Sequence, residues 1–151
     1  MSCTNSPLYM VVPPNTAVAL ELNCRELGPA RLTFPEGIGA IEKDTVFGFR
    51  CCNEVQAINI TTGHHVAVSE AFEVITPDDF HFHEHDEIWL KLPCIFPVPF
   101  NDARLYEQGP NGKWQQRGSA QAIPDADGNL DYFKLKSINP QRHYAVGYEA
   151  H

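Results

Sequence analysis

Three histidines and a glutamate alternate along one short stretch of the chain, where they could together bind a metal ion. His81, His83 and His85 occupy every second position, and Glu87 continues the same spacing. Side chains two residues apart in an extended strand point to the same side and stand about 6.5–7 Å apart. Two neutral imidazoles at that spacing can converge on zinc or iron with nitrogen–metal distances of about 2.0–2.1 Å. A carboxylate such as that of Glu87 could complete the set of ligands.

The same stretch has interpretations that need no metal. If residues 80–92 form one strand, the histidines face one side and the other side packs on a core through Phe80, Phe82, Ile88, Leu90 and Leu92. The histidines could then simply face solvent. They could also form a pH-sensitive patch, because protonated imidazoles repel one another, or surround an ion on a three-fold axis of an assembly. We expect no cofactor unless zinc or iron binds this ladder.

The pattern His81-x-His83-x-x-x-Glu87 resembles the first metal motif of the cupins. The resemblance covers only the residues from His81 to Glu87 and implies a metal-dependent small-molecule enzyme or sensor. The glycine that cupins have six residues before the first histidine is Ile75 here, and the second cupin motif is not clearly present.

Other chemical signatures are weaker. The five cysteines, Cys3, Cys24, Cys51, Cys52 and Cys94, lack zinc-type C-x-x-C spacing. Neighbouring Cys51 and Cys52 would point to opposite faces of a strand, so we expect reduced cysteines that pack as small apolar residues. The segment 125–131 alternates oxygen ligands like a calcium loop, but Leu130 and Lys136 occupy positions where such loops need glycine and glutamate, which favours an Asp-rich turn. Sequence motifs of serine hydrolases, P-loop proteins and zinc metalloproteases are absent.

The elements that would position these residues are short strands. Segments rich in Val, Ile, Phe, Tyr and Thr alternate with turn residues, among them twelve prolines and ten glycines. Strands are expected at 8–12, 17–23, 31–34, 45–51, 55–60, 65–68, 72–76, 87–92, 103–107, 113–117, 130–136 and 143–149. This pattern predicts an all-β fold, an antiparallel β-sandwich of about ten short strands, with a jelly roll or barrel as the alternative. We expect a flexible tail at residues 1–7 and a single domain at 8–151.

Composition narrows the classes of partner. The formal net charge of −8 argues against nucleic acid, because a phosphate backbone requires clustered Lys and Arg. No apolar run reaches the length of about 20 residues that spans a bilayer, and the N-terminus lacks the features of a signal peptide. We therefore expect no membrane span and a cytoplasmic location.

Several segments resemble the β-sandwich domain shared by ankyrins, netrin receptors and tight-junction scaffold proteins. L-T-F-P-E-G-I-G-A-I at Leu32–Ile41 is similar to its proline–glycine–small–isoleucine turn, and I-W-L-K-L-P at Ile88–Pro93 to its later apolar strand. The resemblance implies a non-enzymatic interaction module of cytoplasmic scaffolds. Some members cleave themselves at His-Phe-Ser, but His81 and Phe82 are followed here by His83.

These observations support a non-enzymatic protein-interaction or structural module, within an assembly, that binds a protein partner or copies of itself. The first alternative is the cupin-like metal protein that uses His81, His83, His85 and Glu87. The second is a structural protein of a virus or phage, because jelly-roll sandwiches have the same pattern of strands.

Overall fold

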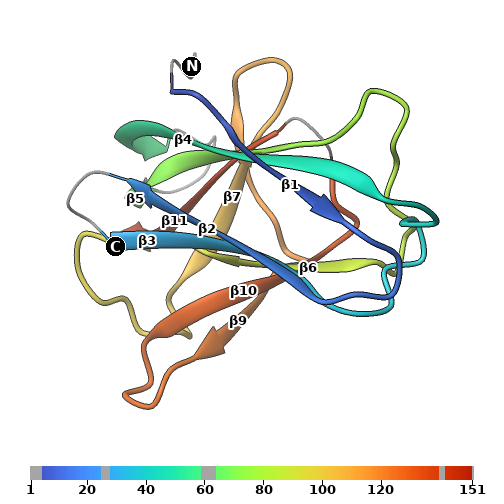
Figure 1. Ribbon diagram of the computed structural model, residues 1–151. Helices are drawn as coiled ribbons and strands as arrows, with labels where there is room; N and C mark the ends of the chain where they lie inside the picture. Colours follow the sequence, from blue (N-terminus) through green and yellow to red (C-terminus); the bar gives the residue numbers. More distant parts are fainter. Residues whose placement is uncertain (1–4, 25–27, 59–63, 140–141, 151) are drawn as a thin grey trace.

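The chain folds into two antiparallel β-sheets that pack face to face (Figure 1). The computed structural model describes residues 5–24, 28–58, 64–139 and 142–150. The larger sheet has the strand order β1 (Leu8–Val12), β4 (Thr45–Ile58), β5 (His64–Ile75), β11 (His143–Ala150), β7 (Arg104–Gln108) and β8 (Trp114–Gln116). The smaller sheet has the order β2 (Val18–Cys24), β3 (Gly28–Phe34), β6 (Glu87–Lys91), β10 (Leu130–Lys136) and β9 (Gln121–Pro124). The predicted all-β sandwich is confirmed.

Side-chain alternation builds the core between the sheets. In β6, Ile88 and Leu90 are buried while the residues between and beside them are not. The same alternation in β4 and β5 brings Phe49 and Phe72 together, with ring centroids 5.4 Å apart. Burial of a large apolar side chain contributes about 1.5–3 kcal/mol, so these inward-facing positions determine the register of each strand.

Strand boundaries follow the sequence closely in most places. β1 and β10 occupy the predicted residues. The segment predicted at 45–51 and residues 55–58 of the segment predicted at 55–60 lie in one strand, β4, while 59 and 60 lie outside the described residues. The segments predicted at 65–68 and 72–76 likewise fall in one strand, β5, which ends at Ile75. Strand β9 was not predicted.

The long strands β4 and β5 are irregular in their middle. The pairing of β4 with β5 shifts register between Cys51 and Val55, and the pairing of β11 with β5 shifts between Tyr144 and Gly147. At the second shift the Ser69 hydroxyl accepts a hydrogen bond of 2.8 Å from the Val146 N–H. A side chain therefore satisfies a buried backbone donor where the ladder is interrupted.

Two turns have the chemistry that their residues favour. Gly112, in the β7–β8 hairpin, has a φ of 79°, a value that glycine adopts without strain. In the β9–β10 turn, Asp125 Oδ1 accepts hydrogen bonds from the Asp127 and Asn129 N–H groups at 2.8 and 3.0 Å. The Asp-rich segment is therefore a turn, and the carboxylate of its first residue is hydrogen-bonded to the backbone of that turn.

The expectation of reduced cysteines is wrong for Cys51 and Cys52, which are disulfide-bonded. Cys51 lies in the main core, while Cys52 belongs to a second apolar cluster with Ala67, Ala71, Tyr106, Trp114 and Ala145. Cys94 is a free cysteine.

None of the residues that the structure describes forms a helix with the length and hydropathy of a bilayer crossing.

Candidate functional site: an aromatic surface on the smaller sheet

The histidine ladder does not lie on one strand. Strand β6 begins at Glu87, and residues 81–86 form a loop that ends in a turn. The premise of one strand from residue 80 to 92 is therefore wrong. Phe80 and Phe82 nevertheless pack against the core, with their rings 5.1 and 5.9 Å from that of Phe47. Phe80 and Phe82 therefore contact the core, as their alternation indicated, but they belong to a loop and not to a strand.

Asp86 explains why the chain turns at this point. Its side chain is buried, and its two carboxylate oxygens accept hydrogen bonds from three backbone N–H groups, those of Gly39 at 2.8 Å, Ala40 at 3.1 Å and His83 at 2.8 Å. Charge-assisted bonds of this kind are about twice as strong as neutral ones. One carboxylate thus fastens the histidine loop to the loop between β3 and β4.

The side chains of the predicted metal set have different surroundings. His81, His83 and His85 are exposed, and the His83 ring lies against Gly39, where an added Cβ would be 3.0 Å from Nδ1. Glu87 is half-buried, and its Oε1 accepts a 2.8 Å hydrogen bond from the Trp89 indole N–H. Among the described residues, no group of three or more His, Cys, Asp or Glu side chains is placed to hold a metal ion. The metal site stays a prediction that rests on the sequence pattern.

The bond from Glu87 leads to the outer face of the smaller sheet. Because Ile88 and Leu90 point into the core, Trp89 between them points outward. The strand pairing places Ala19, Thr33, Trp89, Lys134 and Gln121 in one row across all five strands. Small side chains at Ala19 and Thr33 therefore stand beside the large indole of Trp89.

A shallow hollow of about 310 Å³ results from this difference in size. We call it the Trp89 surface, and its lining residues are Ala19, Arg31, Thr33, Trp89, Lys91, Asp131 and Tyr132. The Trp89 and Tyr132 rings are 5.5 Å apart and tilted by 36°. The Lys134 ammonium stands over the indole, 5.4 Å from its centroid. Glu87 and Lys134 thus fix the indole from two directions.

Two exposed ion pairs border the Trp89 surface. Arg31 Nη2 lies 2.9 Å from Glu21 Oε2, and Lys91 Nζ lies 2.9 Å from Asp131 Oδ1. Exposed pairs contribute about 0–1 kcal/mol to stability, so a charged ligand can replace either partner at little cost.

The charge of this face differs from that of the whole chain. Four basic residues lie on it, Arg31, Lys91, Lys134 and Lys136, beside three carboxylates, Glu21, Glu87 and Asp131. The whole chain has 11 basic and 19 acidic residues. The outer face of the smaller sheet around Trp89 thus carries a slight excess of positive charge, with four basic and three acidic side chains, in an acidic protein.

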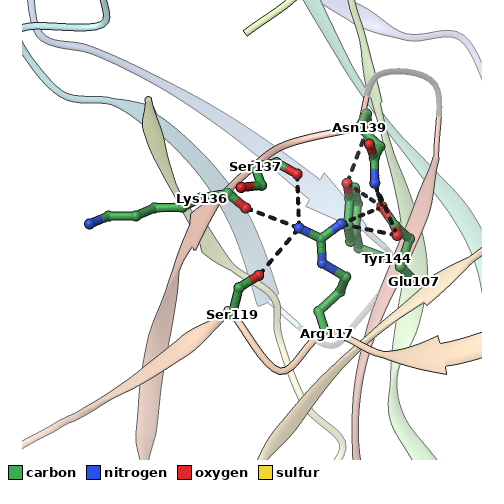
Figure 2. A network of polar contacts seen from close by, with 7 residues as sticks. All are labelled: Glu107, Arg117, Ser119, Lys136, Ser137, Asn139 and Tyr144. Atoms are coloured by element: carbon green, nitrogen blue, oxygen red, sulfur yellow. Dashed lines mark hydrogen bonds and ion pairs between the residues drawn. The ribbon is translucent and has the colours of Figure 1, made fainter. Parts of the chain in front are cut away.

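A second polar cluster has the same residue types but a different environment (Figure 2). Arg117 Nη1 lies 3.1 Å from both carboxylate oxygens of Glu107, and Arg117 Nη2 donates to the carbonyl oxygens of Lys136 and Ser137 at 3.0 and 2.9 Å. Because Glu107 belongs to β7 and Lys136 to β10, this guanidinium connects the two sheets. We call this group, with Tyr144 and Asn139, the Arg117 cluster.

Tyr144 completes the cluster from β11. Its hydroxyl donates to Glu107 Oε1 at 2.9 Å and approaches the Asn139 carbonyl oxygen at 3.2 Å. Burial, and then the neighbouring Glu107 carboxylate, raises the pKa of Tyr144, so the hydroxyl stays protonated. The donors and acceptors of the cluster bond to one another across the two sheets, which is the property of a structural clamp.

Several candidate nucleophiles among the described residues are buried or partly buried. Ser69 and Glu70 are fully buried in β5. Burial raises the pKa of the free Cys94 thiol to about 11, which leaves little thiolate at neutral pH. Burial also raises the pKa of Tyr106, which contacts His65, to about 12. These groups are suited to packing more than to covalent chemistry.

The Trp89 surface was not among the candidate sites of the sequence analysis. Trp114, the other tryptophan, is buried in the second apolar cluster. The alternation of β6 could have predicted that Trp89 points outward. The small side chains of Ala19 and Thr33 beside it could not have been predicted, because they become neighbours of Trp89 only through the order of the strands. No family model, curated protein or solved structure matches this chain.

Proposed function

We propose that this chain is a non-enzymatic protein-interaction module that docks its partner on the Trp89 surface. The observation that carries the proposal is the hollow beside Trp89 and Tyr132, bordered by the exchangeable cations Arg31 and Lys91. Trp, Tyr and Arg are the residues most enriched among those that dominate binding energy at protein interfaces.

The size and charge of the hollow define the partner segment. A volume of about 310 Å³ is at the lower end for small-molecule sites and suits one anchoring side chain of a protein partner. The local excess of Lys and Arg favours a segment that carries carboxylates around that anchor. No specific observation on the described residues favours the metal-dependent alternative to the same degree.

The disulfide-bonded state of Cys51 and Cys52 bears on where this module works. Disulfides persist in oxidising compartments and are rare in the cytosol. We therefore place the module in an oxidising environment, in place of the cytoplasmic location expected from the sequence. Thiol counting on the unfolded, unreduced protein tests this point, because five free thiols would contradict it.

Quantitative affinity capture tests the proposed function. The wild-type protein and the variants Trp89→Ser and Lys91→Glu are used to capture proteins from an extract of the source cells. We expect at least one protein whose recovery falls by about tenfold or more with each variant, as for a residue that dominates an interface.

Ile95→Ser is the matched control, because Ile95 is 50% exposed and lies outside the Trp89 surface. Its captured proteins should equal those of the wild type, and thermal unfolding should show that all variants are folded. The proposal fails if the same proteins are recovered in equal amounts with the wild type and with both surface variants.

A further inference from the structure

The four strands at the edges of the two sheets are protected to different degrees. Edge strands expose unpaired backbone groups that can pair with another chain, and proteins usually shorten or charge them. Strand β8 has three residues, and β9 has four and ends at Pro124. Strand β2 carries Glu21, which is paired with Arg31 of β3.

Strand β1 is flanked by prolines like β9, but it is longer than β8 and β9 and carries no charge. It contains five uncharged residues, L-Y-M-V-V, and pairs in regular register with β4 alone among the described strands. Figure 1 shows β1 (dark blue) at the edge of the larger sheet. Among the described residues, no strand pairs with its second edge.

Exposed apolar side chains accompany this open edge. Tyr9, Val11 and Val46 are 57%, 50% and 47% exposed, and the register places Val11 opposite Val46. The Tyr9 ring lies on Gly48, where an added Cβ would be 2.8 Å from Cε1. These three side chains form an apolar strip on the outer face of the larger sheet, directly beside its edge.

We propose that a second copy of this chain pairs its β1 antiparallel with this β1 and joins the two larger sheets into one continuous sheet. A two-fold axis at Met10 would place Leu8 opposite Val12 of the second copy and Tyr9 opposite its Val11. Each Tyr–Val pair is an aromatic–β-branched pair, which stabilises antiparallel strands by about 0.2–1 kcal/mol. The proposal does not depend on the Trp89 surface.

The length and charge of β1 favour a second copy as the occupant. Pro7 and Pro13 bracket the strand, so a partner strand of about the same length fills the edge, and β1 itself has that length. The strip and its strand carry no charge, so two copies bring no like charges together there. The net charge of −8 on each copy makes the two copies repel each other, but this repulsion is screened beyond about 8 Å at physiological salt.

The contact is small for a stable dimer. One pair of five-residue strands with the apolar strip lies at the low end of specific interfaces, which bury about 1,200 Å² or more. The dimer should therefore be weak and concentration-dependent, with a dissociation constant between about 10 μM and about 1 mM.

Sedimentation velocity on the wild-type chain, from about 1 μM to about 1 mM, tests the proposal. We expect the monomer at the low end and the dimer at the high end. The variant Val11→Lys puts a charge on an exposed position of the strip and should stay monomeric throughout. Ile95→Lys makes the same change at a side chain that is also 50% exposed but distant in sequence, and should dimerise like the wild type.

Hydrogen exchange at high concentration should slow at the β1 amides of the wild type and remain fast in Val11→Lys. A wild type that is monomeric at every concentration overturns the proposal. It is also overturned if Val11→Lys dimerises as well as Ile95→Lys. Binding of a synthetic peptide with the β1 sequence to a wild type that does not self-associate would assign the edge to a foreign strand and refute the dimer.

Discussion

The Arg117 cluster and the Trp89 surface use the same kinds of side chain for opposite purposes. Both combine a cation, a carboxylate and an aromatic ring. The Arg117 and Glu107 side chains are only 12% and 13% exposed, whereas those of Arg31 and Glu21 are 51% and 50% exposed. Burial therefore separates them more clearly than residue type does.

The two regions differ equally in how their hydrogen bonds are distributed. Arg117 contacts one carboxylate and two backbone carbonyl groups, so moving it would break several bonds at once and leave the largely buried Glu107 carboxylate without its cation. The cations of the Trp89 surface pair with exposed carboxylates that water can replace. The Arg117 cluster holds the two sheets together, whereas the cations of the Trp89 surface can exchange their carboxylate partners for water or a ligand.

Removal of the buried cation should have the largest effect on stability. Arg117→Met leaves the Glu107 carboxylate largely buried without its cation, and breaking a buried pair costs about 3–5 kcal/mol. Denaturant unfolding should therefore show a large decrease in the midpoint. Lys91→Met, the matched change on the Trp89 surface, should lower stability by about 0–1 kcal/mol. Equal losses in the two variants would abolish the distinction between the regions.

A smaller loss is expected when the tyrosine hydroxyl alone is removed. Tyr144→Phe keeps the buried ring but removes the donor to Glu107, while Arg117 and Asn139 still contact that carboxylate. We expect a loss of about 1.5–3 kcal/mol, as for one hydrogen bond to a charged group. Because the raised pKa keeps Tyr144 protonated, the loss should be the same at pH 6 and pH 9. A neutral effect would show that the hydroxyl is not part of the clamp.

The sequence could predict the sandwich because alternation is a local property. Each strand from β1 to β11 except β9 carries enough inward apolar residues to be recognised, whereas β9 has only Ala122 and Ile123 between Gln121 and Pro124. The same reasoning wrongly predicted a strand at the histidines. Phe80 and Phe82 alternate and contact the core, but they lie in a loop that Asp86 holds through hydrogen bonds to backbone groups distant in sequence. The Trp89 surface depends on the order β2-β3-β6-β10-β9, which no single segment encodes.

A third polar group, on the outer face of the larger sheet, should give a modest dependence on pH. Glu73 contacts Arg50, and its Oε2 lies 3.8 Å from His143 Nε2. Burial lowers the pKa of His143 below its usual 6.5, although Glu73 acts in the opposite direction. The unfolded chain therefore binds more protons than the folded one just below pH 6.5, so stability falls as the pH decreases through that window.

Chemical denaturation of the wild type and His143→Gln at pH 7.5, 6.5 and 5.5 measures this contribution. The advantage of the wild type over the variant should decrease toward pH 5.5. An advantage that grows as the pH decreases would mean that the attraction to Glu73 exceeds the effect of burial.

The histidine loop should show the smallest effect of all. His81, His83 and His85 are exposed, and the bonds that hold their loop come from Asp86 and the backbone. Replacement of all three by Gln should change stability by no more than about 0.5 kcal/mol at pH 7.5, as for surface positions in general. A thermal shift of the wild type with zinc or iron that is absent from the triple variant would instead support the metal site, since a ligand at a hundredfold excess over its dissociation constant adds about 2.7 kcal/mol. The triple variant thus decides whether this loop belongs with the exposed, exchangeable groups or forms a binding site of its own.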